Sequence, residues 1–229
     1  MPAPSSNLRW KIAQAAEIRW WQRYLRKRPK ADYLLWKRQY WQNMLQKAAV
    51  ELQPGDAVLD AGCGPAGIFL VLQQQKVDAV DPLLEEYAQK LPHFSKSDYP
   101  YVQFHACPLE DFQPTTQYQQ IFCLNAINHV AALDQCLDGL VDCLAPGGQL
   151  FLSIDAHNHP FFKRLFRWIP GDILHPHQYD QKEYQEMLTK RGLHLSSALL
   201  FDEGFFFNYY LLVAQKPLVK RYTSTTEAD

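Results

Sequence analysis

The sequence lacks both long apolar runs and paired cysteine motifs. No stretch of its 229 residues reaches the roughly 18 consecutive apolar residues that a membrane-spanning helix requires. The first residues, MPAPSSNLRWKIAQ, lack the apolar core of a secretory signal. The five cysteines are an odd number without C-x-x-C spacing, which argues against a disulfide framework and a zinc knuckle. We therefore expect a cytoplasmic protein with no membrane span and with reduced cysteines.

Net charge is also small, at −1, but its distribution along the chain is uneven. Residues 1–50 contain eleven Lys and Arg side chains against two acids, Glu17 and Asp32, so the excess of acids lies in the rest of the chain. Such asymmetry can mark an anionic partner, but a solvated helical face that pairs with an acidic body is the simpler explanation. Because a compact basic block and a recognition-helix motif are also missing, we expect no nucleic-acid partner.

The order of the expected elements predicts an α/β fold. Aromatic and apolar residues at helical spacing predict two helices, over 7–28 and 30–51. From residue 57 onward, short apolar strands alternate with helices, which favours a parallel sheet covered on both faces. We expect strands over 57–61, 77–80, 101–106, 121–124 and 149–154, and helices over 68–75, 83–91, 131–144 and 180–191.

The end of the chain departs from this alternation. The last two strands, 196–201 and 205–214, are joined by a link too short for a crossover helix, which predicts a hairpin with an antiparallel strand. The parts that we expect are a helical cap (1–51), a main domain (52–216) with an inserted loop (155–179), and a flexible tail (217–229).

A glycine turn follows the first strand. The stretch VLDAGCGPAG, residues 58–67, has glycines at the spacing G-x-G-x-x-G, which alone does not distinguish a dinucleotide from another ligand. Asp60, before the turn, would repel a pyrophosphate and attract an ammonium group. Asp81, at the end of the next strand, is placed to accept hydrogen bonds from both hydroxyls of a ribose. An ammonium group and an adenosyl ribose together describe S-adenosyl-L-methionine (SAM).

Four stretches resemble, in order and spacing, the motifs of the class I SAM-dependent methyltransferases: VLDAGCGPAG, AVDP, IFCLNAINHV and LAPGGQLFLSI. The resemblance covers roughly residues 50–215 and points to small-molecule enzymes similar to the methyltransferases of quinone biosynthesis. It implies a Rossmann-like, doubly wound sheet of seven strands in the order 3-2-1-4-5-7-6, with an antiparallel last hairpin and the N-terminal helices as a cap. It also implies SAM as the cofactor.

The resemblance further implies cofactor contacts, residue by residue. These are Asp60, Gly62, Cys63 and Gly64 for the methionine moiety, Asp81 for the ribose, Pro82 and Leu83 for the adenine, and the carbonyl of Asn125 for the ammonium group. Many members have an acid after the third strand that binds the adenine amino group. Here the stretch HACPLEDF departs from that pattern, so we expect the Leu109 backbone or Glu110 to substitute.

Candidates for catalysis and acceptor binding follow the fourth and fifth strands. Methyl transfer needs mainly positioning and exclusion of water, and a base only where the acceptor must lose a proton. The catalytic candidates are His129, His157 and His177, and the acceptor-binding candidates are Asn128, His159, Phe162, His175 and Tyr179. Structural histidines or a metal held by the H-x-H and H-P-H pairs are alternatives. We favour acceptor binding or general-base catalysis and expect no metal.

The predicted function is methyl transfer from SAM to an O, N or S atom of a small, partly apolar molecule. RNA or protein methylation through the basic N-terminal helices is an alternative, although the N-P-P-Y box and a Pro-Cys nucleophile motif are missing. A non-catalytic SAM-binding protein is a second alternative. Whether the protein forms a homodimer stays open.

Overall fold

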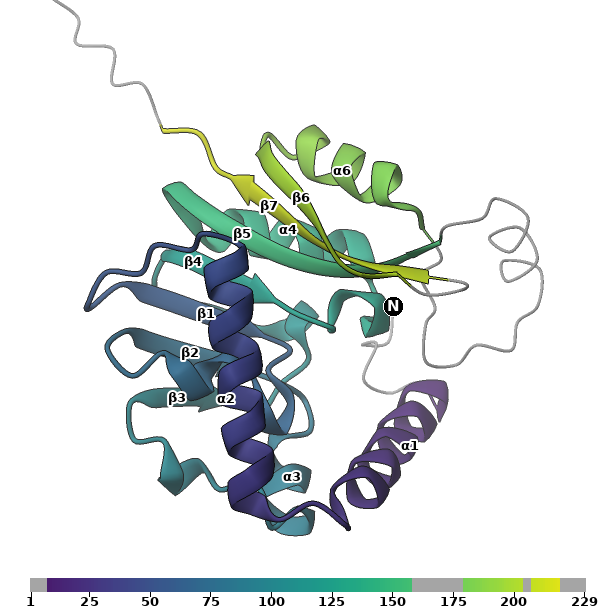
Figure 1. Cartoon of the computed structure of the whole chain (residues 1–229). Coiled ribbons are helices and arrows are strands. Elements are labelled where there is room, and N and C mark those ends of the chain that lie inside the picture. Colours follow the sequence, from purple (N-terminus) through teal and green to yellow (C-terminus); the bar gives the residue numbers. More distant parts are fainter. Residues whose placement is uncertain (1–7, 158–178, 204–206, 219–229) are drawn as a thin grey trace, which may run out of the picture.

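The computed structural model describes residues 8–157, 179–203 and 207–218 (Figure 1). These residues form one seven-stranded sheet with the order β3-β2-β1-β4-β5-β7-β6. Its strands are β1 (Ala57–Ala61), β2 (Lys76–Val80), β3 (Val102–His105), β4 (Tyr118–Cys123), β5 (Leu144–His157), β6 (His194–Glu203) and β7 (Phe207–Gln215). Strands β1 to β5 pair in parallel, whereas β7 is antiparallel to both β5 and β6. The predicted strand order and the antiparallel hairpin are confirmed.

Helices cover both faces of the sheet (Figure 1). They are α1 (Leu8–Leu25), α2 (Lys30–Lys47), α3 (Leu84–Lys90), α4 (Leu133–Cys143) and α6 (Gln181–Lys190). Successive side chains of a strand point to opposite faces, so Val58 joins a hydrophobic core with α1, α2 and α3, and Leu59 joins one with α4 and α6. Within the described ranges no helix could span a membrane, because each is too short or too polar to cross a bilayer.

The prediction of a helix over 68–75 is wrong. The chain instead makes two short 3-10 turns, Gly64–Ala66 and Ile68–Val71, before it reaches β2. Residues 68–70 are fully buried, so this segment has no polar side to turn toward water as a surface helix would. The 3-10 turn Ile68–Val71 packs against α2, which covers this part of the sheet.

Helix α2 runs across the face of the sheet (Figure 1), and polar contacts hold it at its start, near its middle and at its end. Near its start, the Lys30 ammonium lies 2.9 Å from the Asp98 carboxylate. The indole N–H of Trp41 donates to the carbonyl of Ala66, within the glycine turn, at 3.0 Å. At its end, Lys47 donates to a backbone carbonyl of β6 at 2.9 Å. These contacts fix α2 relative to both the first strand and the edge of the sheet.

Strand β5 is longer than the predicted 149–154. Its ladder with β7 runs without a break from the pair Gln149–Gln215 to the pair His157–Phe207. Residues 155–157 are therefore strand, although they were expected to open the inserted loop. The antiparallel partner explains the difference, because its hydrogen bonds continue past the point where the apolar pattern of β5 ends.

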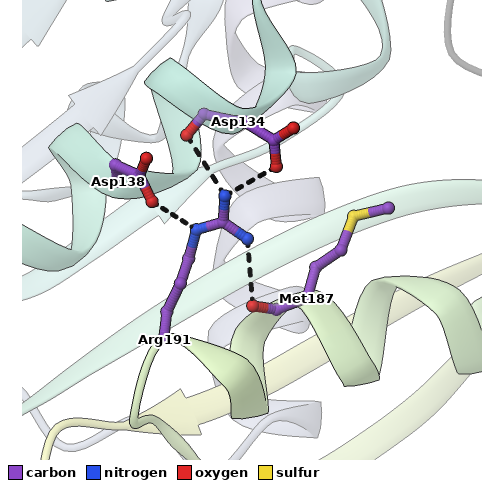
Figure 2. A network of polar contacts seen from close by, with 4 residues as sticks. All are labelled: Asp134, Asp138, Met187 and Arg191. Carbon is purple, nitrogen blue, oxygen red and sulfur yellow. Dashed lines mark hydrogen bonds and ion pairs between the residues drawn. The ribbon is translucent and has the colours of Figure 1, made fainter.

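Arg191 joins α6 to α4 on the opposite face (Figure 2). Its guanidinium lies 2.7 Å from the Asp134 carboxylate and 2.6 Å from the Asp138 carboxylate. It also donates to the carbonyl of Met187 at 3.1 Å. The Arg191 side chain is 15% exposed, whereas both carboxylates lie at the surface. The guanidinium thus connects the last turn of α6 to two successive turns of α4.

Replacing Arg191 with alanine should lower the free energy of unfolding by about 1 kcal/mol, because the partners are exposed and screened by solvent. Chemical denaturation measures the change, with Lys190→Ala as the control for a neighbouring exposed cation. Equal stability of the two variants would show that these ion pairs do not hold α6 in place.

Candidate functional site

A cavity of about 670 Å³ lies between the carboxyl ends of β1, β2 and β4 and the two N-terminal helices. Small-molecule sites commonly have volumes of about 300–1,000 Å³, and open α/β sheets bind ligands at this end of their strands. The wall that α1 and α2 supply is aromatic and consists of Trp20, Trp21, Tyr24, Tyr33, Trp36 and Trp41. The opposite wall is made by the turns that follow the strands.

The glycine turn after β1 presents bare backbone to this cavity. Gly62 and Gly64 have φ angles of +74° and +57°, in the left-handed region that favours glycine. A Cβ on Gly62 would lie 2.2 Å from the Cβ of Ala126, so the turn touches the loop after β4. A Cβ on Gly64 would meet nothing within 4 Å. A ligand can therefore approach the backbone at Gly64 closely.

Asp60 lines the cavity and also holds the turn in shape. Its carboxylate is buried and accepts the backbone N–H of Phe69 at 3.0 Å. A Cβ on Gly67 would lie 2.3 Å from that carboxylate oxygen, so glycine is required there. Burial raises the pKa of Asp60 to about 7, while hydrogen bonds from the Phe69 and Ile68 backbone and the nearby charge of Lys37 act in the opposite direction.

Asp81 performs a similar task at the end of β2. One carboxylate oxygen accepts the N–H of Gly64 at 2.9 Å, and the other accepts the N–H of Leu83 at 2.8 Å. Burial raises the pKa of Asp81 to about 7, and the charge of Glu17 on α1 adds to this effect. Two adjacent strands therefore end in buried carboxylates, and both carboxylates bind the backbone of the turn.

Lys37 is a site residue that the sequence analysis missed. Among the described residues that line the cavity, it is the one Lys or Arg side chain. Its ammonium nitrogen lies 4.5, 5.1 and 5.6 Å from the ring centroids of Trp41, Tyr40 and Trp36, within cation–π range. Burial lowers the pKa of Lys37 to about 8, against the charge of Asp60. The cavity thus has a cation at its Asp60 end.

The loop after β4 is fixed by the neighbouring strand β5. Asn125 has a φ of +55°, and its N–H donates to the Ser153 hydroxyl at 2.7 Å. Further hydrogen bonds join Ser153 to Tyr209 and Tyr209 to Tyr40 of α2. Asn125 and His129 both line the cavity. A chain of polar contacts therefore runs from this loop through β5 and β7 to α2.

Most of the predicted cofactor residues lie together. The cavity lining includes Asp60, Gly62, Cys63, Gly64, Asp81, Pro82, Leu109, Glu110 and Asn125. The Glu110 carboxylate has a second task, because it accepts the N–H groups of Ala131 and Ala132 at 2.7 and 3.1 Å, just before α4. Leu109, with Pro108 before it, lines the cavity from the 3-10 turn that follows β3.

Some predicted acceptor residues lie elsewhere. The Asn128 side chain is buried and accepts the Tyr184 hydroxyl of α6 at 2.7 Å. Tyr179 packs edge-on against the same Tyr184 ring, with centroids 5.7 Å apart. For His157 the structure describes only the backbone, which lies in β5. His159, Phe162, His175 and His177 lie outside the described residues. Among the residues that are described, no group of three or more His, Cys, Asp or Glu is arranged to hold a metal.

Residues 33–198 match a family model described as a methyltransferase domain. The chain belongs to this methyltransferase family. Its strand order with the antiparallel hairpin is that of the class I SAM-dependent methyltransferases, whose cofactor is SAM. The predicted family and cofactor are confirmed.

Curated relatives are distant. The chain is 24% identical over 160 residues to a ubiquinone biosynthesis O-methyltransferase of Rickettsia canadensis, an alignment that covers 63% of this chain and 66% of the relative. A protein of the same name from Rickettsia felis is also 24% identical, with 64% of its length covered. The chain thus spans less than two thirds of the length of these relatives.

Solved structures share the fold. A methyltransferase structure from Bacillus halodurans C-125 superposes with a TM-score of 0.63 at 16% identity, covering 76% of this chain and 98% of that one. The 1,6-didemethyltoxoflavin-N1-methyltransferase of Burkholderia thailandensis, which contains its substrate and S-adenosylhomocysteine, superposes with a TM-score of 0.54 at 18% identity. That alignment covers 79% of this chain and 78% of the other. At these identities the likeness concerns the fold alone.

The raised pKa of Asp81 predicts how stability depends on pH. Because its pKa is about 7 in the folded chain and 3.8 when unperturbed, the folded state binds the proton more tightly. Lowering the pH from 7 to 5.5 should therefore stabilise the ligand-free wild type more than Asp81→Asn, by about 2 kcal/mol. Denaturation of both proteins at each pH measures this difference. A difference of zero, or of opposite sign, would contradict the assigned pKa shift.

Proposed function

We propose that the protein transfers the methyl group of SAM to an O, N or S atom of a small, flat, partly apolar acceptor. The observation that carries the proposal is the two-sided cavity, with the residues that we assign to the cofactor on one wall and six aromatic rings on the other. Its relatives' names point the same way, since they mention ubiquinone biosynthesis and a toxoflavin precursor.

The charged groups of the cavity favour one orientation of the bound cofactor. Lys37 lies toward Asp60, and Glu17 lies toward Asp81. In this orientation the methionine carboxylate meets the ammonium of Lys37, and the ribose lies beside Asp81. The carbonyl of Asn125 accepts from the cofactor's ammonium group. A buried carboxylate requires such a partner, because its desolvation is otherwise costly.

The aromatic wall suits a planar acceptor. Trp20 and Tyr24 stack with centroids 4.9 Å apart and an interplanar angle of 10°, so they present parallel ring faces. Trp20 is 54% exposed and Trp36 is 46% exposed, although both line the cavity. We assign them to its mouth, where exposed aromatic rings can stack on an entering ring. His129, on the loop after β4, is our candidate for the base if the acceptor must lose a proton.

When bound, SAM supplies a methyl group already activated on a sulfonium. The protein has to align the acceptor with that methyl group and exclude water. The apolar wall of α1 and α2 excludes water, and the turns after β1 and β4 position the groups that react. This division of tasks needs no metal.

A turnover screen tests the proposal. Purified protein is incubated with SAM and matched sets of phenols, amines, thiols and carboxylic acids, and the release of S-adenosylhomocysteine is measured. We expect turnover of a planar aromatic acceptor. Methylation of RNA or protein alone, or SAM binding without turnover of any set, would contradict the assignment to small molecules.

The role of Lys37 can be tested by binding. Lys37→Met should weaken SAM binding by about 10- to 100-fold, because it removes a charge-assisted contact to the carboxylate. Decarboxylated SAM, which lacks that carboxylate, should bind the variant and the wild type equally. Isothermal titration measures both ligands, with Lys30→Met at the exposed start of α2 as the control. An equal loss for both ligands would assign Lys37 a purely structural role.

A further inference from the structure

Helix α1 carries a single acid, Glu17, and this acid lines the cavity. Glu17 accepts the hydroxyl of Tyr87 on α3 at 2.8 Å and the indole N–H of Trp21 at 3.4 Å. Tyr87 is fully buried, so its hydroxyl fixes the position of the Glu17 carboxylate against the body of the protein. Both contacts are made to Oε1. The other oxygen, Oε2, takes part in neither of them.

The Asp81 side chain lines the same cavity as Glu17. Asp81 is close enough for the charge of Glu17 to raise its pKa. Each oxygen of Asp81 already accepts one backbone N–H, from Gly64 and from Leu83. Two carboxylates that face one cavity repel each other unless donors lie between them. The site is therefore suited to a ligand group with two neighbouring hydrogen-bond donors.

We propose that Glu17 is a second ribose-binding residue: its carboxylate accepts one hydroxyl of the cofactor's ribose, and Asp81 accepts the other. This assignment rests on the proposed orientation of SAM. A vicinal diol offers two donors on adjacent carbons, which matches two acceptors that belong to different elements. The same pair of carboxylates disfavours a nucleotide with a phosphate on the ribose, because the phosphate would add a third negative charge.

The assignment makes the N-terminal helix part of the cofactor site. Through Tyr87 the Glu17 carboxylate is linked to α3, the helix that follows Asp81 along the chain. The ribose is then held between the end of β2 and α1. Loss of this contact should weaken the binding of the ribose and leave the contacts to the methionine end of the cofactor unchanged.

The test is a thermodynamic cycle that combines one substitution in the protein with the removal of one ribose hydroxyl from the ligand. Isothermal titration compares the binding of S-adenosylhomocysteine and of its 2′-deoxy and 3′-deoxy analogues to the wild type and to Glu17→Gln. We expect the substitution to weaken the binding of S-adenosylhomocysteine by about tenfold, which corresponds to the loss of one hydrogen bond to a charged group. For the analogue that lacks the hydroxyl bound by Glu17, it should cause no further loss. Glu86→Gln, an exposed acid on α3, is the matched control.

The outcomes separate this inference from the proposed function. If the wild type fails to bind S-adenosylhomocysteine, the proposed function fails. If the wild type binds it and Glu17→Gln has no effect, or weakens all three ligands equally, the ribose assignment is overturned. Should Glu17→Gln unfold, Tyr87→Phe serves instead, because it removes the hydroxyl that fixes the Glu17 carboxylate. That variant should discriminate less than the wild type against the analogue that lacks the hydroxyl bound by Glu17, and unchanged discrimination against both analogues would overturn the assignment.

Discussion

Two buried carboxylates hold the turn between β1 and β2, and the cavity owes its shape to them. Asp60 accepts the N–H of Phe69, and Asp81 accepts the N–H of Gly64, so the glycine turn is fastened at both ends. Burying a carboxylate is costly, and backbone donors repay only part of that cost, as the raised pKa of each shows. In the binding mode that we propose, the ammonium group and the hydroxyls of SAM supply further partners at this place.

The sheet could be predicted from the sequence because its signals are local. Each strand is a short apolar run, and the short link between the last two strands requires a hairpin. The segment 68–75 was mispredicted because an apolar run of this length does not distinguish a buried 3-10 turn from a helix. What decides between them is tertiary: α2 packs against this segment, and Trp41 binds the carbonyl of Ala66.

Only the part of the site that the sheet contributes could be predicted from the sequence. Asp60 and Asp81 follow strands, and a residue in that position has a known place at the edge of a sheet. Glu17 and Lys37 lie in helices whose aromatic residues indicated packing, and their position in the cavity depends on where the helices dock. A signal was present nonetheless, since Glu17 is one of two acids in the first fifty residues. The roles of the histidines in the inserted loop stay predictions.

The path of α2 has a consequence for synthesis on the ribosome. This helix is made early, but Lys47 at its end binds a carbonyl of β6, 153 residues further along the chain. This contact can therefore form only after most of the sheet has been made, and apolar surface that stays exposed until then promotes aggregation. The aromatic wall that we assign to the acceptor is thus apolar surface that has to be kept from aggregating until the sheet is complete.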